Sequence, residues 1–186
     1  MFCSFGNETG KQGKRSMRKQ KGFSLIELLI VVAIILIIAA IAIPNLMRAR
    51  MAANDSSAAA SVRSINTAEI AYIAAYPTIG YPALMTTLGG AAPCAPGVAT
   101  GCIIDNYLAT NGAGNGKSGY NFNATGSASA GAINDQFYST GTPFGAVSGT
   151  RAYCSYEDAV LRLQAPGVIT LVPSRVACVA LNPMSN

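Results

Sequence analysis

The feature that most constrains this chain is an uninterrupted apolar run near its N-terminus. Residues 25–43 contain only Leu, Ile, Val and Ala, apart from Glu27. The run matches the roughly 20 residues that cross the hydrocarbon of a bilayer as a helix. It is too long for the apolar core of a secretory signal peptide, which is also followed by its cleavage site. We therefore expect a helix that sits in a membrane or in an equally apolar surrounding.

The charge of the chain is concentrated before this run. The formal net charge is +5, and Glu8 is the only acid before Phe23, whereas the charges from Phe23 onward cancel. Positive residues on one side of an apolar span keep that side in the cytoplasm. Since the excess positive charge lies before Phe23, the sequence does not indicate a basic patch for nucleic acid on the part of the chain that follows. The basic residues before Phe23 are Lys11, Lys14, Arg15, Arg18, Lys19 and Lys21.

Glu27 is a carboxylate placed inside one end of the apolar run. Burying such a charge in a membrane costs at least a few kcal/mol, so a plain membrane anchor does not explain it. An acid in this position indicates a function and requires a partner.

Residues 21–32 read KGFSLIELLIVV and resemble the class III signal of type IV pilins and type II secretion pseudopilins. In that family a prepilin peptidase cuts after the glycine, and the new N-terminal Phe is usually N-methylated. The resemblance implies cleavage after Gly22, Phe23 as the methylated mature N-terminus, and Glu27 as an assembly residue that pairs with the Phe23 ammonium of a neighbouring subunit. Pro44 matches the family's proline. Residues 1–22 are then a leader, and because residues 17–22 alone form a complete basic leader, Met17 is an alternative start.

A second, amphipathic stretch follows from residue 45 to 76. Apolar residues recur there at steps of three and four, which predicts that the helix continues from residue 23 to 76. Pro44 predicts a kink or a melted turn around residues 40–44. We expect Tyr72 and Tyr76 to pack in the core rather than carry electrons. The apolar face contains Val62, Ile65, Ala68 or Glu69, Tyr72 and Tyr76, with Arg63, Asn66 and Thr67 between them.

The remainder predicts a sheet. Residues 77–116 form a long connection with many Gly and Pro, and residues 117–186 show two-residue alternation with polar turns. Short strands of this kind indicate an antiparallel meander and an α+β class. The resemblance implies that the sheet packs on the long helix, as in the type IV pilin fold. Strands are expected within 120–123, 136–138, 152–155 and 159–163, with further ones at 168–172 and 176–181.

Four cysteines follow the apolar run and predict two disulfides in an exported domain. The sequence leaves three pairings open, of which we prefer Cys94–Cys102 with Cys154–Cys178 because both are local and do not cross. Cys3 lies in the leader and has no expected role. The chain has no His, which argues against zinc. Asp105, Asn106 and Asp135 lack the spacing of a calcium loop, and we expect them to be solvated loop residues.

No nucleophile motif, phosphate loop or acid–base pair is recognisable, so we expect neither an enzyme nor a cofactor. The resemblance implies a structural subunit of a pilus-like filament, single-pass in the inner membrane as precursor and extracellular after assembly. Its partners would be further copies of itself, a prepilin peptidase, an inner-membrane platform and a cytoplasmic ATPase. Two alternatives stay open: a periplasmic type II secretion pseudopilin, and a monomeric membrane-tethered module for adhesion or DNA uptake.

Overall fold

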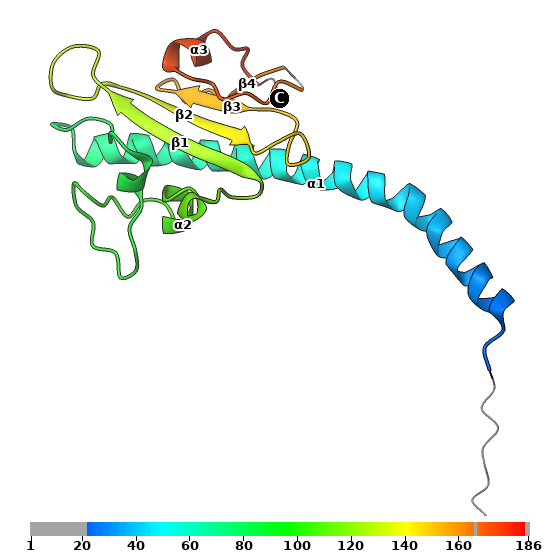
Figure 1. The fold of residues 1–186 in the computed structure, drawn as a ribbon. Helices are drawn as coiled ribbons and strands as arrows, with labels where there is room; N and C mark the ends of the chain where they lie inside the picture. Colours follow the sequence, from blue (N-terminus) through cyan, green and yellow to red (C-terminus); the bar gives the residue numbers. More distant parts are fainter. Residues whose placement is uncertain (1–21, 166, 185–186) are drawn as a thin grey trace, which may run out of the picture. The chain divides into compact units, whose positions relative to one another are not determined.

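The computed structural model describes residues 22–165 and 167–184 and divides the chain into two units, one ending at Ile41 and a larger one from Ala42 onward. The leader before Gly22, with Cys3 and the alternative start at Met17, lies outside the described residues. The long N-terminal helix expected from the sequence is confirmed as α1, Leu25–Ala75, which contributes to both units (Figure 1).

The expected melted turn around residues 40–44 is wrong. Pro44 lies inside α1, and the residues before and after it keep helical structure. A proline removes one backbone donor and so leaves the carbonyl four residues earlier without its bond. The remaining hydrogen bonds on both sides, between good helix formers, are sufficient to continue the helix.

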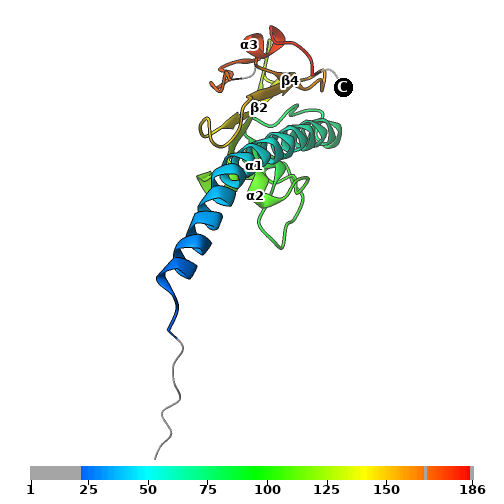
Figure 2. The ribbon, with the colours of Figure 1, turned by 90° about the vertical axis from the view of Figure 1, so that its right-hand side faces the viewer.

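Four strands form one antiparallel sheet in the order β1-β2-β3-β4. The register runs from Tyr120 opposite Pro143 to Ser127 opposite Gln136 for the first pair. This arrangement confirms the predicted meander and the α+β class (Figures 1 and 2). The strands are β1 Tyr120–Ser127, β2 Gln136–Pro143, β3 Tyr153–Tyr156 and β4 Arg162–Leu163.

The connection between α1 and the sheet contains short helices, two of which share a core with the main helix. They are η1 Met85–Leu88, α2 Asn106–Ala109 and η2 Gly112–Gly114. Met85, Leu88 and Leu108 are buried in the same core cluster as the inner face of α1. The packed half of α1 is therefore covered by the sheet on one side and by residues 77–116 on another, as both views show (Figures 1 and 2).

The main core lies between α1 and the inner face of the sheet. The predicted apolar face of the helix is confirmed, and Tyr72 is among its most deeply buried residues. Asn66, which the sequence pattern assigned to the polar positions, is buried as well. The helix contributes Ala58, Ala59, Val62, Ile65, Ala68 and Tyr72, and the sheet contributes Tyr120, Phe122, Ala124 and Tyr153.

A second, smaller core contains Cys154, Val172 and Cys178. The two further strands expected at 168–172 and 176–181 are wrong: residues 168–172 have no regular secondary structure, and most of the second stretch belongs to a short helix, α3 Arg175–Val179. Ser174 caps α3 by accepting a hydrogen bond from the backbone nitrogen of Ala177 at 3.3 Å. A serine cap and a link from the helix to β3 thus override the strand preference of the valines.

Candidate assembly segment and the unit that carries it

The first part of α1 is apolar on all sides. Its most apolar window of 18 residues has a mean hydropathy of 3.3, none of it is buried, and the helix is long and apolar enough to cross a membrane. Leu25 is 80% exposed and Ile41 is 66% exposed, whereas Val62 and Ile65 further along are fully buried. An apolar surface of this extent is unfavourable in water and requires a membrane or other protein chains around it. We refer to residues 23–43 as the assembly segment.

The residues that the sequence singled out meet at the start of this segment. Phe23 is 81% exposed, and a side chain at Gly22 would meet none of the described residues within 4 Å. The Glu27 carboxylate accepts a hydrogen bond from the backbone nitrogen of Ser24 at 3.4 Å. Glu27 therefore satisfies an unpaired donor at the helix N-terminus. This capping role was not predicted from the sequence, although Ser24 and Glu27 have the Ser-x-x-Glu spacing of a capping box.

Asp55 joins α1 to the sheet and to the loop before β3. Its carboxylate accepts hydrogen bonds from the Tyr120 hydroxyl at 2.5 Å, the Thr150 backbone nitrogen at 3.0 Å and the Thr150 hydroxyl at 2.6 Å. Tyr120 is fully buried, and burial together with this hydrogen bond holds the pKa of its hydroxyl far above the usual range. The neighbouring Asn54 donates to the Ser148 carbonyl at 2.8 Å. Nothing in the sequence pattern identifies this contact, because its partners are about 65 and 95 residues away.

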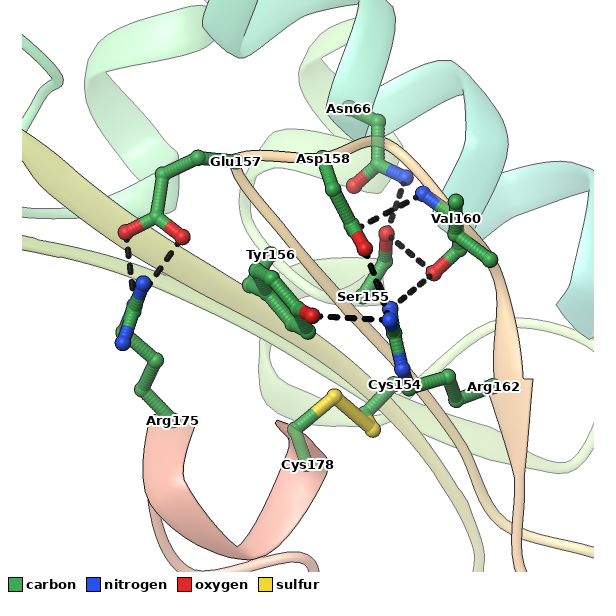
Figure 3. Close-up of polar contacts among 10 residues, drawn as sticks. All are labelled: Asn66, Cys154, Ser155, Tyr156, Glu157, Asp158, Val160, Arg162, Arg175 and Cys178. Atoms are coloured by element: carbon green, nitrogen blue, oxygen red, sulfur yellow. Dashed lines mark hydrogen bonds and ion pairs between the residues drawn. A yellow bond between two sulfur atoms is a disulfide. The ribbon is translucent and has the colours of Figure 1, made fainter. Parts of the chain in front are cut away.

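A second polar bridge lies deeper in the interface. Asn66 is 3% exposed, donates to the Ser155 hydroxyl at 2.7 Å and accepts from the Ser139 hydroxyl at 2.8 Å. The Ser155 hydroxyl donates a hydrogen bond to the Val160 carbonyl at 3.0 Å, as Figure 3 shows. One amide side chain of the helix thereby connects β2, β3 and the turn after β3.

The ring of Tyr156, at the end of β3, is contacted by Arg162 of β4 and by Arg175 of α3 (Figure 3). The guanidinium of Arg162 lies 4.2 Å from the ring centroid and that of Arg175 lies 5.2 Å from it. Arg162 pairs with Asp158 at 2.7 Å, and Arg175 pairs with Glu157 at 2.7 Å. Burial raises the pKa of the Asp158 carboxyl, but hydrogen bonds from Arg162 and the backbone outweigh it and lower the pKa. The cations are engaged by acids, so the cluster braces the fold.

The structure joins Cys94 to Cys102 and Cys154 to Cys178. The first bond closes the loop of the 77–116 segment, where Val98 accepts a hydrogen bond from the Tyr72 hydroxyl at 2.6 Å. The second ties β3 to α3 (Figure 3). Both bonds therefore restrain segments that have few long regular elements of their own.

The acids considered for calcium have local roles instead. Asp105 caps α2 by accepting from the Leu108 backbone nitrogen at 2.8 Å. Asp135 accepts hydrogen bonds from the backbone nitrogen and the hydroxyl of Ser129, which lower the pKa of its carboxyl. Within residues 22–165 and 167–184, no group of three or more His, Cys, Asp or Glu is placed to hold a metal ion.

Comparison with known proteins points to the same segment. The family model of the prokaryotic N-terminal methylation motif matches residues 17–43. A curated relative, the type IV wide pilus major component PilA4 of Thermus thermophilus, is 64% identical over 40 residues. Those residues are 22% of this chain and 30% of the relative, so the match spans less than a third of the relative's length. No solved structure matches the chain.

Proposed function

We propose that this chain, a member of the type IV pilin family by its N-terminal motif and its α+β fold, is the structural subunit of a pilus-like filament that polymerises through the assembly segment. The observation that carries the proposal is the coincidence of the methylation motif with an apolar helix surface that is entirely uncovered. The family is one of structural proteins, which agrees with the absence of a recognisable catalytic motif. The pilus named for the relative in Thermus thermophilus favours a pilus over a secretion pseudopilus.

The proposal assigns the precursor to the inner membrane, with the basic leader in the cytoplasm. A prepilin peptidase would cut after Gly22, and Phe23 would become the methylated N-terminus. Gly22 is exposed and has free space around it, so a larger residue there is compatible with the fold. We therefore expect Gly22→Val to insert normally. It should remain uncleaved because it lacks the glycine after which the peptidase would cut, and the mass of the N-terminal peptide reports this.

Assembly would replace the membrane around α1 by helices of neighbouring copies. In that surrounding an unpaired Glu27 carboxylate is costly, because the apolar medium provides no water to solvate it. The Phe23 ammonium created by cleavage is a matched partner on the next subunit. Pairing removes most of that cost and fixes the axial register of the copy that enters. An inner-membrane platform and a cytoplasmic ATPase would supply the direction and the energy of assembly.

The test compares Glu27→Ala with native chain and with Ser24→Ala as a neighbouring control. We expect Glu27→Ala to insert and to be cleaved normally, but to give at least tenfold less protein in the fibre fraction sheared from cells. Ser24→Ala retains the carboxylate and should assemble at close to native yield. Normal fibre yield from Glu27→Ala contradicts the assigned role of Glu27. Native chain that stays wholly in the inner-membrane fraction contradicts the filament itself and favours a tethered binding module.

A further inference from the structure

Glu69 is the most unusual side chain of the globular unit. It lies on α1, it is 0% exposed, and both of its carboxylate oxygens lack a hydrogen-bond partner among the described residues. An ionised carboxylate in this position is strongly unfavourable, because nothing replaces the water that it loses. Burial accordingly raises the pKa of Glu69 from 4.5 to about 8.

The groups around Glu69 do not compensate a negative charge. Asn66, one helical turn before it, is engaged with Ser139 and Ser155. Tyr72, one turn after it, donates its hydroxyl to the Val98 carbonyl. Each polar neighbour on the helix therefore serves a different contact.

The further titratable groups near this part of α1 are acidic and therefore do not stabilise a negative charge on Glu69. Burial raises the pKa of the Tyr72 and Tyr81 hydroxyls, and negative charge on Glu69 raises both further. Glu157 acts on Tyr81 in the same direction. Glu157 is itself paired with Arg175 at 2.7 Å, so that cation is already engaged by another acid. The ion pairs of the described residues thus leave Glu69 without a counter-charge.

We propose that Glu69 is a pH-responsive element of the globular unit, protonated in the folded subunit at neutral pH, whose ionisation loosens the packing of α1 against its neighbours. The sign follows from proton linkage. The folded state holds a proton that the unfolded state releases at lower pH, so stability is lost as pH rises between the two pKa values. From 4.5 to about 8 the unfolding equilibrium constant rises roughly tenfold per pH unit, on the order of 10³-fold in total. Through Glu69, lowering the pH from about 8 toward 4.5 therefore stabilises this subunit. In a protein held by ionised carboxylates, acid has the opposite effect.

The experiment measures thermal unfolding of the full chain in detergent between pH 4.5 and 9. The native midpoint should fall steadily from pH 5 to 8, and Glu69→Gln should remove this slope and melt higher than native chain at pH 8. Glu157→Gln is the matched control: it removes an acid that is already paired, so the slope should remain. A Glu69→Gln chain that keeps the native slope overturns the proposal.

A spectroscopic readout keeps the test decisive if the Glu69 variants fail to fold. The infrared carbonyl stretch of a protonated carboxyl should be present at pH 7 and disappear around pH 8. It is recorded in a Glu27→Gln background, because Glu27 also lies in apolar surroundings. Absence of the band at pH 7 refutes the proposal. Glu69→Leu, which cannot titrate, serves as the second variant and should lose both the band and the slope.

Discussion

The contact of Asp55 with Tyr120 and Thr150 gives the sharpest test of how α1 is held to the sheet. Asp55→Ala removes an acceptor that receives hydrogen bonds from the Tyr120 hydroxyl and from two donors of Thr150. The Tyr120 hydroxyl retains a second acceptor, the Arg151 carbonyl at 2.8 Å, and is not left unpaired. The loss of stability therefore comes mainly from the two Thr150 donors, which are left without their acceptor. The lost charge-assisted bond from the Tyr120 hydroxyl adds to it.

Hydrogen bonds to a charged group contribute about 1.5–3 kcal/mol each, and their deletions are not additive within one network. We expect Asp55→Ala to lower the free energy of unfolding by about 3 kcal/mol. For a chain of this size that corresponds to a fall of roughly 6–12 °C in Tm. Tyr120→Phe keeps the buried ring and removes only the hydroxyl, and should cost about 1.5–2 kcal/mol.

The assay is thermal unfolding of the full chain in detergent at fixed pH, followed by the near-ultraviolet circular dichroism of the tyrosines with the disulfides intact. Ser56→Ala is the matched control, because Ser56 is an exposed neighbour that bonds only to the Ala52 carbonyl of its own helix. It should shift stability by less than about 0.5 kcal/mol. The double mutant of Asp55 and Tyr120 should lose at least 1 kcal/mol less than the sum of the single losses. Strict additivity would refute the contact as the source of the stability.

Four further changes test other parts of the fold. Replacing both cysteines of Cys154–Cys178 by Ser should cost about 3.4 kcal/mol in denaturant unfolding, and the same change at Cys94–Cys102 about 2.5 kcal/mol, because the first closes a longer loop, with sequence separations of 24 and 8. Equal or reversed losses would contradict this ranking. Asn66→Ala should cost about 2–4 kcal/mol by thermal unfolding, since two serine hydroxyls of the sheet lose their partner. Gly80→Ala should cost more than about 1 kcal/mol, because Gly80 has φ 84° and a Cβ there would collide with the Asn134 carbonyl; an unchanged Tm would exclude that strain.

The long helix and the meander were predictable because their signals are periodic over many residues. The apolar run and the three-and-four spacing up to Tyr76 specify a helix whatever it packs against. The same spacing placed Ala68 or Glu69 on the buried face, and the structure buries both side chains. The alternation around Tyr120 and Phe122 specified a strand with one face in the core.

The remaining features depend on contacts that no local pattern records. Residues 176–181 have the valine content of a strand, yet the region forms α3 because Ser174 caps it and Cys178 is bonded to Cys154. Asn66 is polar and was assigned to the outer face, but it is buried where two serines from different strands complete its hydrogen bonds. Ser174 is a local capping signal, but Cys154 lies 24 residues from Cys178, and the two serines lie 73 and 89 residues from Asn66, so neither outcome follows from propensity alone.

The buried hydrogen bonds also explain how a helix face rich in small side chains is held in position along the sheet. The inner face of α1 includes Ala58, Ala59 and Ala68, whose short side chains bring the sheet close but interlock little with it. These alanine positions alone would allow a slide of one turn along the sheet at low cost in apolar contact, whereas Val62, Ile65 and Tyr72 of the same face are closely packed. Asp55 and Asn66 are three turns apart on the helix, about 16 Å along its axis, and each bonds to a different part of the sheet region. Sliding by one turn breaks both sets of bonds at once and leaves their buried groups unpaired, so the polar bridges fix the axial position that the alanines alone would leave undetermined.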